Sequence, residues 1–408
     1  MDNKYSFTRN ACYISYTVQA LAVNIAPLFF VIFRERYGLS FSELGFLVLF
    51  TFLVQLTVDI ASIKIIDRIG YKKTAMLANI VASVGFVLMA VLIEFINPLP
   101  ALLISSFFYS SGAGLIEVVI NPIVEALPNR NLGATLTILH SFYGWGQTAV
   151  ILISTVILYF LTNRYWNTIP LLWALVPLIN VFLFINSPVI ENSDENEKRS
   201  LYILKKPVFI LFMIIMLCGG STEMVIAQWA SYFAEKGLEV SKVYGDLLGP
   251  CVFGLMMALG RMLYGIFGAK FSIYKALIVC SLTATLAYIG IALVLHPLTV
   301  MFFFAIAGIA SSLLWPGTLA LSANSIKHGG SAMFALLAFA GDVGCSLGPW
   351  LSGVINDAMI LCQPSGIMSK LGLTSEQAAL RYSMLITSLF PFCMLLVLIF
   401  FKKMNKTK

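Results

Sequence analysis

Apolar runs of about 20 residues or more recur along the whole chain, with short polar segments between them. A helix of that length crosses the roughly 30 Å hydrocarbon core of a bilayer. Backbone polar groups in lipid must be satisfied within the protein, and the alternating pattern of a membrane barrel is missing here. We therefore predict twelve membrane-spanning helices, near 11–33, 43–65, 74–96, 99–126, 133–161, 167–188, 207–233, 243–268, 273–295, 298–323, 331–358 and 379–401.

The composition excludes a soluble globular protein. Of the 408 residues, 59% are hydrophobic and 11% are charged, and the mean hydropathy is +0.91. Such a chain has too few polar residues to cover its own surface in water. The predicted fold class is an all-α membrane protein embedded in the lipid bilayer.

Lys and Arg residues gather on one side of the predicted spans. If both termini lie inside, 19 of the 26 basic residues fall on the inner side, and the outer side keeps Arg34, Arg36, Arg164, Lys236, Lys242, Lys370 and Arg381. This bias predicts cytoplasmic termini and accounts for the net charge of +7 without a nucleic-acid partner. The short loops, and an N-terminus without a strong cleavable signal, favour a bacterial cytoplasmic (inner) membrane.

A polar segment, "SPVIENSDENEKRSLYILKKP" (187–207), divides the spans into two sets of six. It predicts a six-helix bundle over 1–188, a cytoplasmic linker over 189–206 and a second bundle over 207–408. Short matches relate the halves: "DRIGYKK" (67–73) to "AKFSIYK" (269–275), and "SFFYSSGAGLIEVVINP" (106–122) to "MFFFAIAGIASSLLWPG" (301–317). Internal repeats of this kind are typical of secondary transporters and predict two pseudo-symmetric bundles.

Glycines and a proline are concentrated in "GDVGCSLGPWLSG" (341–353), in the eleventh predicted span. Small residues let helix backbones approach closely, and proline bends a helix. We expect this span to pack tightly against a neighbour and to bend.

Five acidic residues lie within or at the ends of predicted spans: Asp59, Glu117, Glu125, Glu223 and Asp342. A charge inside the membrane costs at least ~2.5–3.5 kcal/mol, which makes such residues functional candidates. Asp59 is assigned to the inner end of the second span and Glu125 to the inner mouth of the fourth, and both are set aside.

The other three acids lie deeper, and no Lys or Arg is expected at their depth, Arg261 being placed near the inner face. A carboxylate in that setting tends to hold a proton, so Glu117, Glu223 and Asp342 are predicted to couple transport to protons. The alternative is a permanently neutral acid that hydrogen-bonds between helices.

Polar and aromatic residues accompany these acids. Amide and hydroxyl groups bind sugar hydroxyls, and aromatic rings cover the apolar face of a sugar. The alternative for each is packing or anchoring at the membrane interface, and for the histidine a structural hydrogen bond. The predicted substrate-binding residues are Asn24, Glu117, Asn121, His140, Tyr143, Gln147, Glu223, Gln228, Trp229 and Trp315.

The layout of six plus six spans, the central linker and "DRIGYKK" together resemble the major facilitator superfamily over the whole chain. The loop departs from the family pattern at Ile63, where a glycine is usual, and at Tyr71, where Arg or Lys is usual. The resemblance implies the major facilitator fold. It also implies that Asp67, Arg68 and Lys72 are gating residues that hold the halves together on the cytoplasmic side. The alternative is an ordinary basic inner loop.

"GLIEVVINP" (114–122) is similar to a Gly-x-x-Glu-x-x-x-Asn-Pro signature in the fourth span of the fucose:proton symporter branch of that superfamily. The similarity implies that Glu117 is a membrane-embedded site of proton coupling or sugar binding. The branch has a second acid in its first span, where this chain offers only Gln19 and Asn24.

No enzyme motif or nucleotide-binding loop is present in the sequence, so we expect neither catalysis nor a cofactor nor a bound metal. We expect a monomeric secondary transporter that takes up a sugar or similar small polar solute with protons by alternating access. Two alternatives remain: a proton-driven exporter of drugs or metabolites, and a membrane receptor that does not transport.

Overall fold

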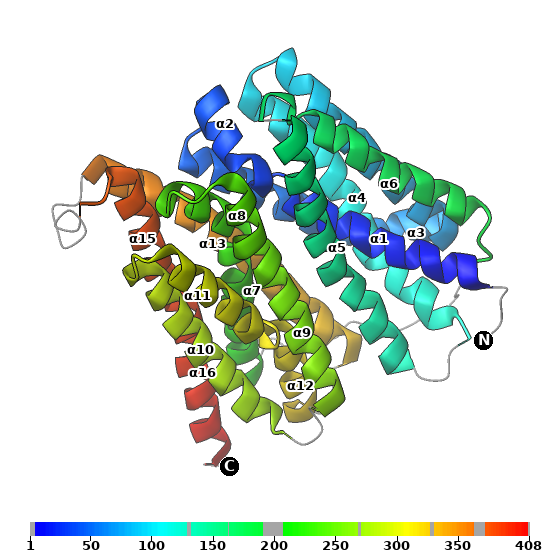
Figure 1. Ribbon diagram of the computed structural model, residues 1–408. Helices are drawn as coiled ribbons and strands as arrows, with labels where there is room; N and C mark the ends of the chain where they lie inside the picture. Colours follow the sequence, from blue (N-terminus) through cyan, green and yellow to red (C-terminus); the bar gives the residue numbers. More distant parts are fainter. Residues whose placement is uncertain are drawn as a thin grey trace. The chain divides into compact units, whose positions relative to one another are not determined.

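The computed structural model describes residues 5–128, 132–161, 163–190, 207–267, 271–326, 330–362 and 372–406. Within these ranges, nothing is described of the side chains of 63–65, 67, 132–137, 163, 265–267, 330–332, 334–335 and 405–406. The regular structure of the described ranges is entirely helical (Figure 1). The predicted linker, 189–206, lies outside the described residues from 191 onward.

Contacts divide the chain into two compact units, which we describe one at a time. The first comprises Met1–Leu39 and Phe50–Glu195, and the second comprises Ser40–Leu49 and Asn196–Lys408. The division at Glu195 falls within the predicted linker.

The first unit is built mainly from α1, the larger part of α3, α4, α5 and α6, with α1 packed against α4, α5 and α6. Its elements, in chain order, are α1 (Ser6–Asn24), η2 (Pro27–Phe29), α2 (Phe30–Tyr37), α3 (Phe41–Val91), η3 (Leu92–Glu94), α4 (Pro98–Ala126), α5 (Leu132–Leu161), η4 (Asn163–Tyr165) and α6 (Thr168–Ile185). The helical run of α3 is interrupted at Gly70, whose φ is 78°. Glycine adopts this backbone conformation at little steric cost, so Gly70 separates the second predicted span from the third.

The second unit centres on α7, which packs against α13 and α16, while α10 packs against α11 and α16 (Figure 1). Its elements are α7 (Pro207–Tyr232), the π-helical η6 (Phe233–Gly237), α8 (Lys242–Asp246), the π-helical η7 (Leu247–Cys251), α9 (Val252–Phe267), α10 (Ile273–Leu293), α11 (Pro297–Ser311), α12 (Leu314–Ser325), α13 (Gly330–Cys362), α15 (Ser375–Thr387) and α16 (Leu389–Lys406).

Eleven helical segments of the described residues are long and apolar enough to cross a membrane. They coincide with eleven of the twelve predicted spans. The remaining one, predicted at 331–358, is the helix α13, whose 33 residues reach about 50 Å at 1.5 Å per residue. The all-α prediction is therefore confirmed.

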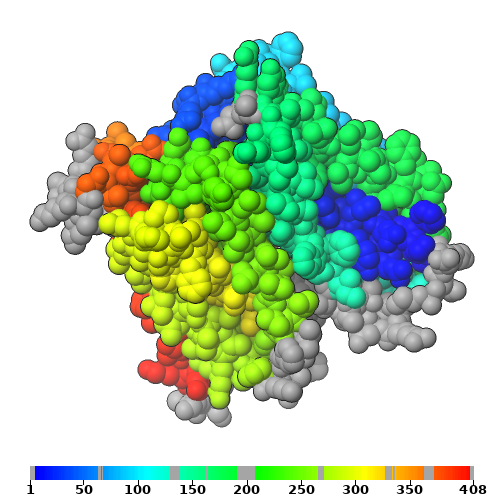
Figure 2. Space-filling view, viewed as in Figure 1, coloured from blue at the N-terminus to red at the C-terminus, as the bar shows by residue number. Residues whose placement is uncertain are grey.

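The outward faces of the helices are apolar, as lipid requires. On α10, Val279, Leu282, Leu286 and Leu293 are exposed, while the opposite face is buried in the unit. Their spacing of three, four and seven residues keeps them on one side of the helix. The α9–α11 region forms the yellow-green to yellow part of the surface in Figure 2. This pattern reverses that of a soluble protein, in which large apolar patches are rare.

The first turn of α3 is held by a carboxylate from α13. Asp357 accepts hydrogen bonds from the backbone N–H groups of Phe41 at 3.2 Å and Ser42 at 2.6 Å. The first N–H groups of a helix lack partners within it, and a negative charge there also favours the helix dipole. A Cβ on Gly353 would lie 2.3 Å from the carbonyl oxygen of Phe41, so the approach depends on glycine. These contacts explain why Ser40–Leu49 clusters with the second unit.

Glycines also bring α7 and α13 together. A Cβ on Gly344 would lie 2.0 Å from the carbonyl oxygen of Leu217, and one on Gly220 would lie 2.3 Å from that of Gly341. Neither distance is compatible with a side chain unless the backbones separate. The prediction that the glycine-rich span packs tightly is confirmed.

Gly219 and Gly220 provide a matched test of this packing. A Cβ on Gly219 would meet Leu314 at 3.4 Å from its Cβ and 3.5 Å from its carbonyl oxygen, which are ordinary contact distances. Alanine is favoured over glycine in a helix by up to about 1 kcal/mol, so we expect Gly219→Ala to be neutral or stabilising. Gly220→Ala should cost about 1–3 kcal/mol because the helices must move apart. Thermal unfolding of the two detergent-purified variants checks this, and equal melting temperatures would contradict it.

Candidate functional site

Glu117 lies on α4, and its carboxylate accepts a hydrogen bond from the side chain of Gln19 on α1. The distance from Gln19 Nε2 to Glu117 Oε2 is 2.9 Å. Gln19 is only 8% exposed, and its Oε1 has no hydrogen-bond partner among the described residues. The intramembrane acid is therefore stabilised by a neutral amide that still has an unused acceptor.

A second hydrogen bond joins the same two helices. The hydroxyl of Tyr16 donates to Asn121 Oδ1 at 2.9 Å, and the ring of His140 on α5 lies edge-on to the Tyr16 ring at 5.0 Å. Of the predicted site residues, Glu117, Asn121 and His140 are thus brought together. We call Tyr16, Gln19, Glu117, Asn121 and His140 the Glu117 cluster.

Tyr16 and Gln19 were not among the predicted site residues. They are three residues apart on α1 and so share one face of that helix. An amide and a phenol on one face of an otherwise apolar span are a signal that could have identified them.

The other predicted residues of the first unit take different positions. Gln147 on α5 is 2% exposed, and its Nε2 has no partner in the described part of the chain. Its neighbour Gly146 touches α1, where a Cβ would lie 2.9 Å from Thr17 Cα. Tyr143 is half-buried on the same helix. Asn24 donates to the carbonyl oxygen of Ala20 within its own helix.

Asp59, which was set aside as an inner-end residue, lies three residues before Ser62, where the second candidate span ends. A Cβ on Gly114 would lie 3.2 Å from Asp59 Oδ1 and 3.1 Å from the carbonyl oxygen of Gln55. Asp59, on α3, therefore faces α4 at Gly114, which lies about one helical turn before Glu117 on that helix. Its Oδ1 is buried and accepts no hydrogen bond from the described residues.

The expectation that Glu223 lacks a cationic partner is wrong. Arg261 Nη2 lies 3.2 Å from Glu223 Oε2 and 3.3 Å from Oε1, and Arg261 Nε also donates to the carbonyl oxygen of Ser312. Glu223 is 6% exposed. The long, flexible arginine stem carries its charge from α9 to α7, a reach that its sequence position does not reveal.

The remaining predicted residues of the second unit lie in packed surroundings. Trp229 is completely buried, and its indole N–H donates to the carbonyl oxygen of Pro349 at 3.0 Å. Gln228 is 1% exposed, with Nε2 3.9 Å from the sulfur of Met224. A Cβ on Gly341 would lie 2.3 Å from the half-buried ring of Trp315, next in sequence to Asp342.

The predicted gating loop is only partly described. Lys72 Nζ donates to the carbonyl oxygen of Ile185 at 3.0 Å, within the first unit, and Arg68 is exposed. The side chain of Asp67 lies outside the described residues.

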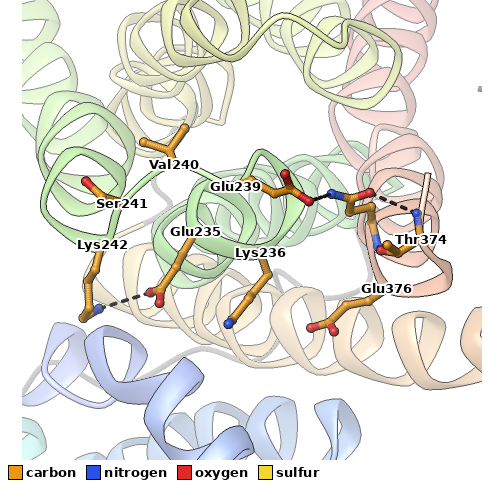
Figure 3. Close-up of a pocket in the computed structure, with 9 residues that line it drawn as sticks. Glu235, Lys236, Glu239, Val240, Ser241, Lys242, Thr374 and Glu376 are labelled. Atoms are coloured by element: carbon orange, nitrogen blue, oxygen red, sulfur yellow. Dashed lines mark hydrogen bonds and ion pairs between the residues drawn. The ribbon is translucent and has the colours of Figure 1, made fainter. Parts of the chain in front are cut away.

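A polar cavity of about 510 Å³ opens at one end of the second unit, where η6, the turn after it, α8 and the start of α15 meet (Figure 3). Two of its carboxylates, those of Glu235 and Glu239, have partners within the lining. Lys242 lies 3.8 Å from Glu235, and the Gln377 side chain donates to Glu239 at 2.9 Å. The cavity lies about twelve residues, or roughly 18 Å along the helix, beyond Glu223. It is therefore separate from the intramembrane acids.

Comparison with known proteins identifies the family. The sequence model described as "Major Facilitator Superfamily" matches residues 12–349. The chain belongs to the major facilitator superfamily. It is therefore an integral membrane protein of a family of transporters. No curated protein sequence is similar enough to this chain to match it.

Solved structures agree in fold. A bacterial homologue of the human lysosomal transporter Spinster, inward-facing and occupied, is 16% identical with a TM-score of 0.78, over 99% of this chain and 98% of that one. The nucleoside transporter NupG is 10% identical (TM-score 0.74; 98% and 100% covered). A D-xylose-proton symporter is 14% identical (TM-score 0.71; 95% and 97% covered). At these identities the similarity shows the fold alone, and it confirms the predicted major facilitator fold of two six-helix halves.

The Glu223–Arg261 pair should behave as an interacting unit. Arg261→Gln leaves a buried carboxylate without its counter-charge, and we expect a cost on the order of 1–3 kcal/mol. The double variant with Glu223→Gln removes the charge as well and should recover most of that loss. Melting temperatures of the wild type, both single variants and the double variant form a double-mutant cycle. Additive effects would contradict the pairing.

Proposed function

We propose that this protein is a proton-coupled secondary transporter that takes up a sugar or a similar small polar solute by alternating access. The observation that supports this most directly is the Glu117–Gln19 hydrogen bond, because it places an ionisable group against a neutral amide within membrane-spanning helices. An acid in that setting binds and releases a proton as water reaches it from one side or the other.

Polar and aromatic groups of the first unit support the proposed solute class. Gln19 Oε1 is an unused acceptor, Gln147 Nε2 is an unused donor, and Tyr16 and Tyr143 supply aromatic rings in the same unit. Directed amide groups beside aromatic rings suit a polyhydroxylated ligand. The similarity in fold to a D-xylose-proton symporter and to a nucleoside transporter supports the same class. The likeness of "GLIEVVINP" to the fucose:proton branch is a further argument for it.

We assign the proton to Glu117 first. Glu223 lies 3.2 Å from Arg261, whereas Glu117 has only a neutral amide against its carboxylate. Glu223 and Asp342 remain proposed as further coupling groups, with Gln228, Trp229 and Trp315 as proposed solute contacts of the second unit. Asn24, Asn121 and His140 are proposed for the first unit.

The cycle requires two bundles that rock about the site. We propose that these are 1–188 and 207–408, joined by the cytoplasmic linker 189–206, with Asp67, Arg68 and Lys72 as gating residues. We further propose a monomer in a bacterial cytoplasmic membrane with both termini in the cytoplasm.

Glu117→Gln should separate solute movement from proton movement. Glutamine keeps the shape and a hydrogen-bonding group but cannot release a proton in this pH range. In liposomes that contain a pH-sensitive dye, solute-dependent proton uptake by the variant should fall to background, while exchange of labelled solute for unlabelled solute continues. The panel should cover sugars, nucleosides and apolar drugs.

Glu125→Gln is the matched control, because Glu125 lies two turns further along α4 and is exposed. It should retain proton uptake. Proton uptake that persists in Glu117→Gln would overturn the assignment of the proton. Outward movement of apolar drugs alone would favour the exporter.

A further inference from the structure

Asp59 and Glu117 occupy neighbouring positions between α3 and α4. Gly114 is the contact point on α4: with no side chain there, Asp59 Oδ1 lies 3.2 Å from the site where a Cβ would be. Glu117 follows Gly114 by three residues and so lies on the same face of the helix. The two acids are close enough to interact electrostatically. Two carboxyl groups therefore lie near each other where α3 meets α4.

Buried amides surround this pair and are not satisfied by the protein. Gln19, 8% exposed, donates to Glu117 and keeps Oε1 without a partner in the described part of the chain. Gln55, 5% exposed and one turn before Asp59 on α3, has Nε2 without a partner there as well. Buried polar atoms are nearly always hydrogen-bonded. The two amide atoms without a partner therefore point to a bound proton, water or solute that would complete their hydrogen bonds.

The titratable neighbours of the pair come from two other helices. Tyr16 of α1 lies near Glu117, with Cys12 beside Tyr16, and His140 of α5 packs on the Tyr16 ring. The described side chains form no ion pair with either carboxylate. The pair is therefore embedded among neutral or weakly acidic groups and one histidine.

We propose that Asp59 and Glu117 form a single proton site in which the two carboxylates hold one proton between them. Two carboxylates in a low-dielectric site cannot both be ionised at little cost. In one access state a proton from water bonds to a carboxylate oxygen, and the net charge of the pair becomes −1. In the other state that O–H bond breaks, the proton leaves to water and the net charge returns to −2. The unused amide atoms of Gln19 and Gln55 are available to the protonated form or to solute hydroxyl groups.

This inference rests on the proposed proton coupling and specifies its stoichiometry, one proton per pair. Asp59 takes the part that a first-span acid has in the symporter branch the chain resembles. The small Gly114 has a role in it too, because a side chain there would push Asp59 away from Glu117.

Asp59→Asn tests the pair with little change of shape. Removing the neighbouring negative charge makes Glu117 hold its proton less tightly. The pH of half-maximal proton-driven uptake should therefore fall by about one unit or more. Asp59→Glu, which keeps the charge, should shift the midpoint less. A wild-type midpoint in Asp59→Asn would overturn the proposal.

Infrared spectroscopy of the purified protein separates this proposal from the proposed function, because it needs no solute. Each single variant, Glu117→Gln or Asp59→Asn, keeps one carboxyl group of the pair, and the C=O stretch of that group should titrate at lower pH than the stretch of the wild-type pair. Glu125→Gln should match the wild type. If the stretch titrates as expected but no solute drives proton uptake, coupling fails while the pair stands. If Asp59→Asn leaves the titration of the stretch unchanged, the pair fails whether or not Glu117 couples transport.

Discussion

Hydrocarbon offers no hydrogen bonds, and nearly every polar group of this protein has a position that follows from that fact. Hydroxyl groups in the helices bond back to carbonyl groups of the preceding turn, as Thr222 does to Cys218. The amide of Asn180 on α6 donates to the carbonyl oxygen of Ala11, to Ser15 Oγ and to Asn79 Oδ1, and so ties α6 to α1 and α3. Because lipid cannot replace these partners, side-chain hydrogen bonds and glycine contacts hold the helices together.

The same constraint makes the exceptions informative. A buried polar atom that the protein leaves without a partner is costly, and three such atoms of the described residues belong to Gln19, Gln55 and Asp59, close to Glu117. Glu223 shows the opposite solution, since Arg261 crosses from another helix to balance it. The carboxylate of Glu117 is thus held by a neutral amide, whereas that of Glu223 lies against a cation.

The architecture could be predicted because it depends on length and hydrophobicity alone. Runs of about 20 apolar residues form helices whatever their neighbours are. Local relations within one helix were also predictable: Asn121 lies one turn from Glu117 and joins the same cluster. Relations between helices were not. Asp59 and Glu117 are 58 residues apart, and Glu223 and Arg261 are 38 apart, on helices whose rotation about their own axes the hydrophobic pattern does not give.

The sequence by itself determined that this chain crosses a membrane as two sets of helices and that a few acids lie within them, because the cost of placing backbone and charge in lipid is a property of each residue. The tertiary structure decided which acids meet which partners. That outcome depends on how closely helices approach, at glycines such as Gly114 and Gly220, and on which face each helix turns inward. Side-chain hydrogen bonds and ion pairs form only over a few ångströms, so these small displacements make Glu117 and Asp59 neighbours and give Glu223 a counter-ion.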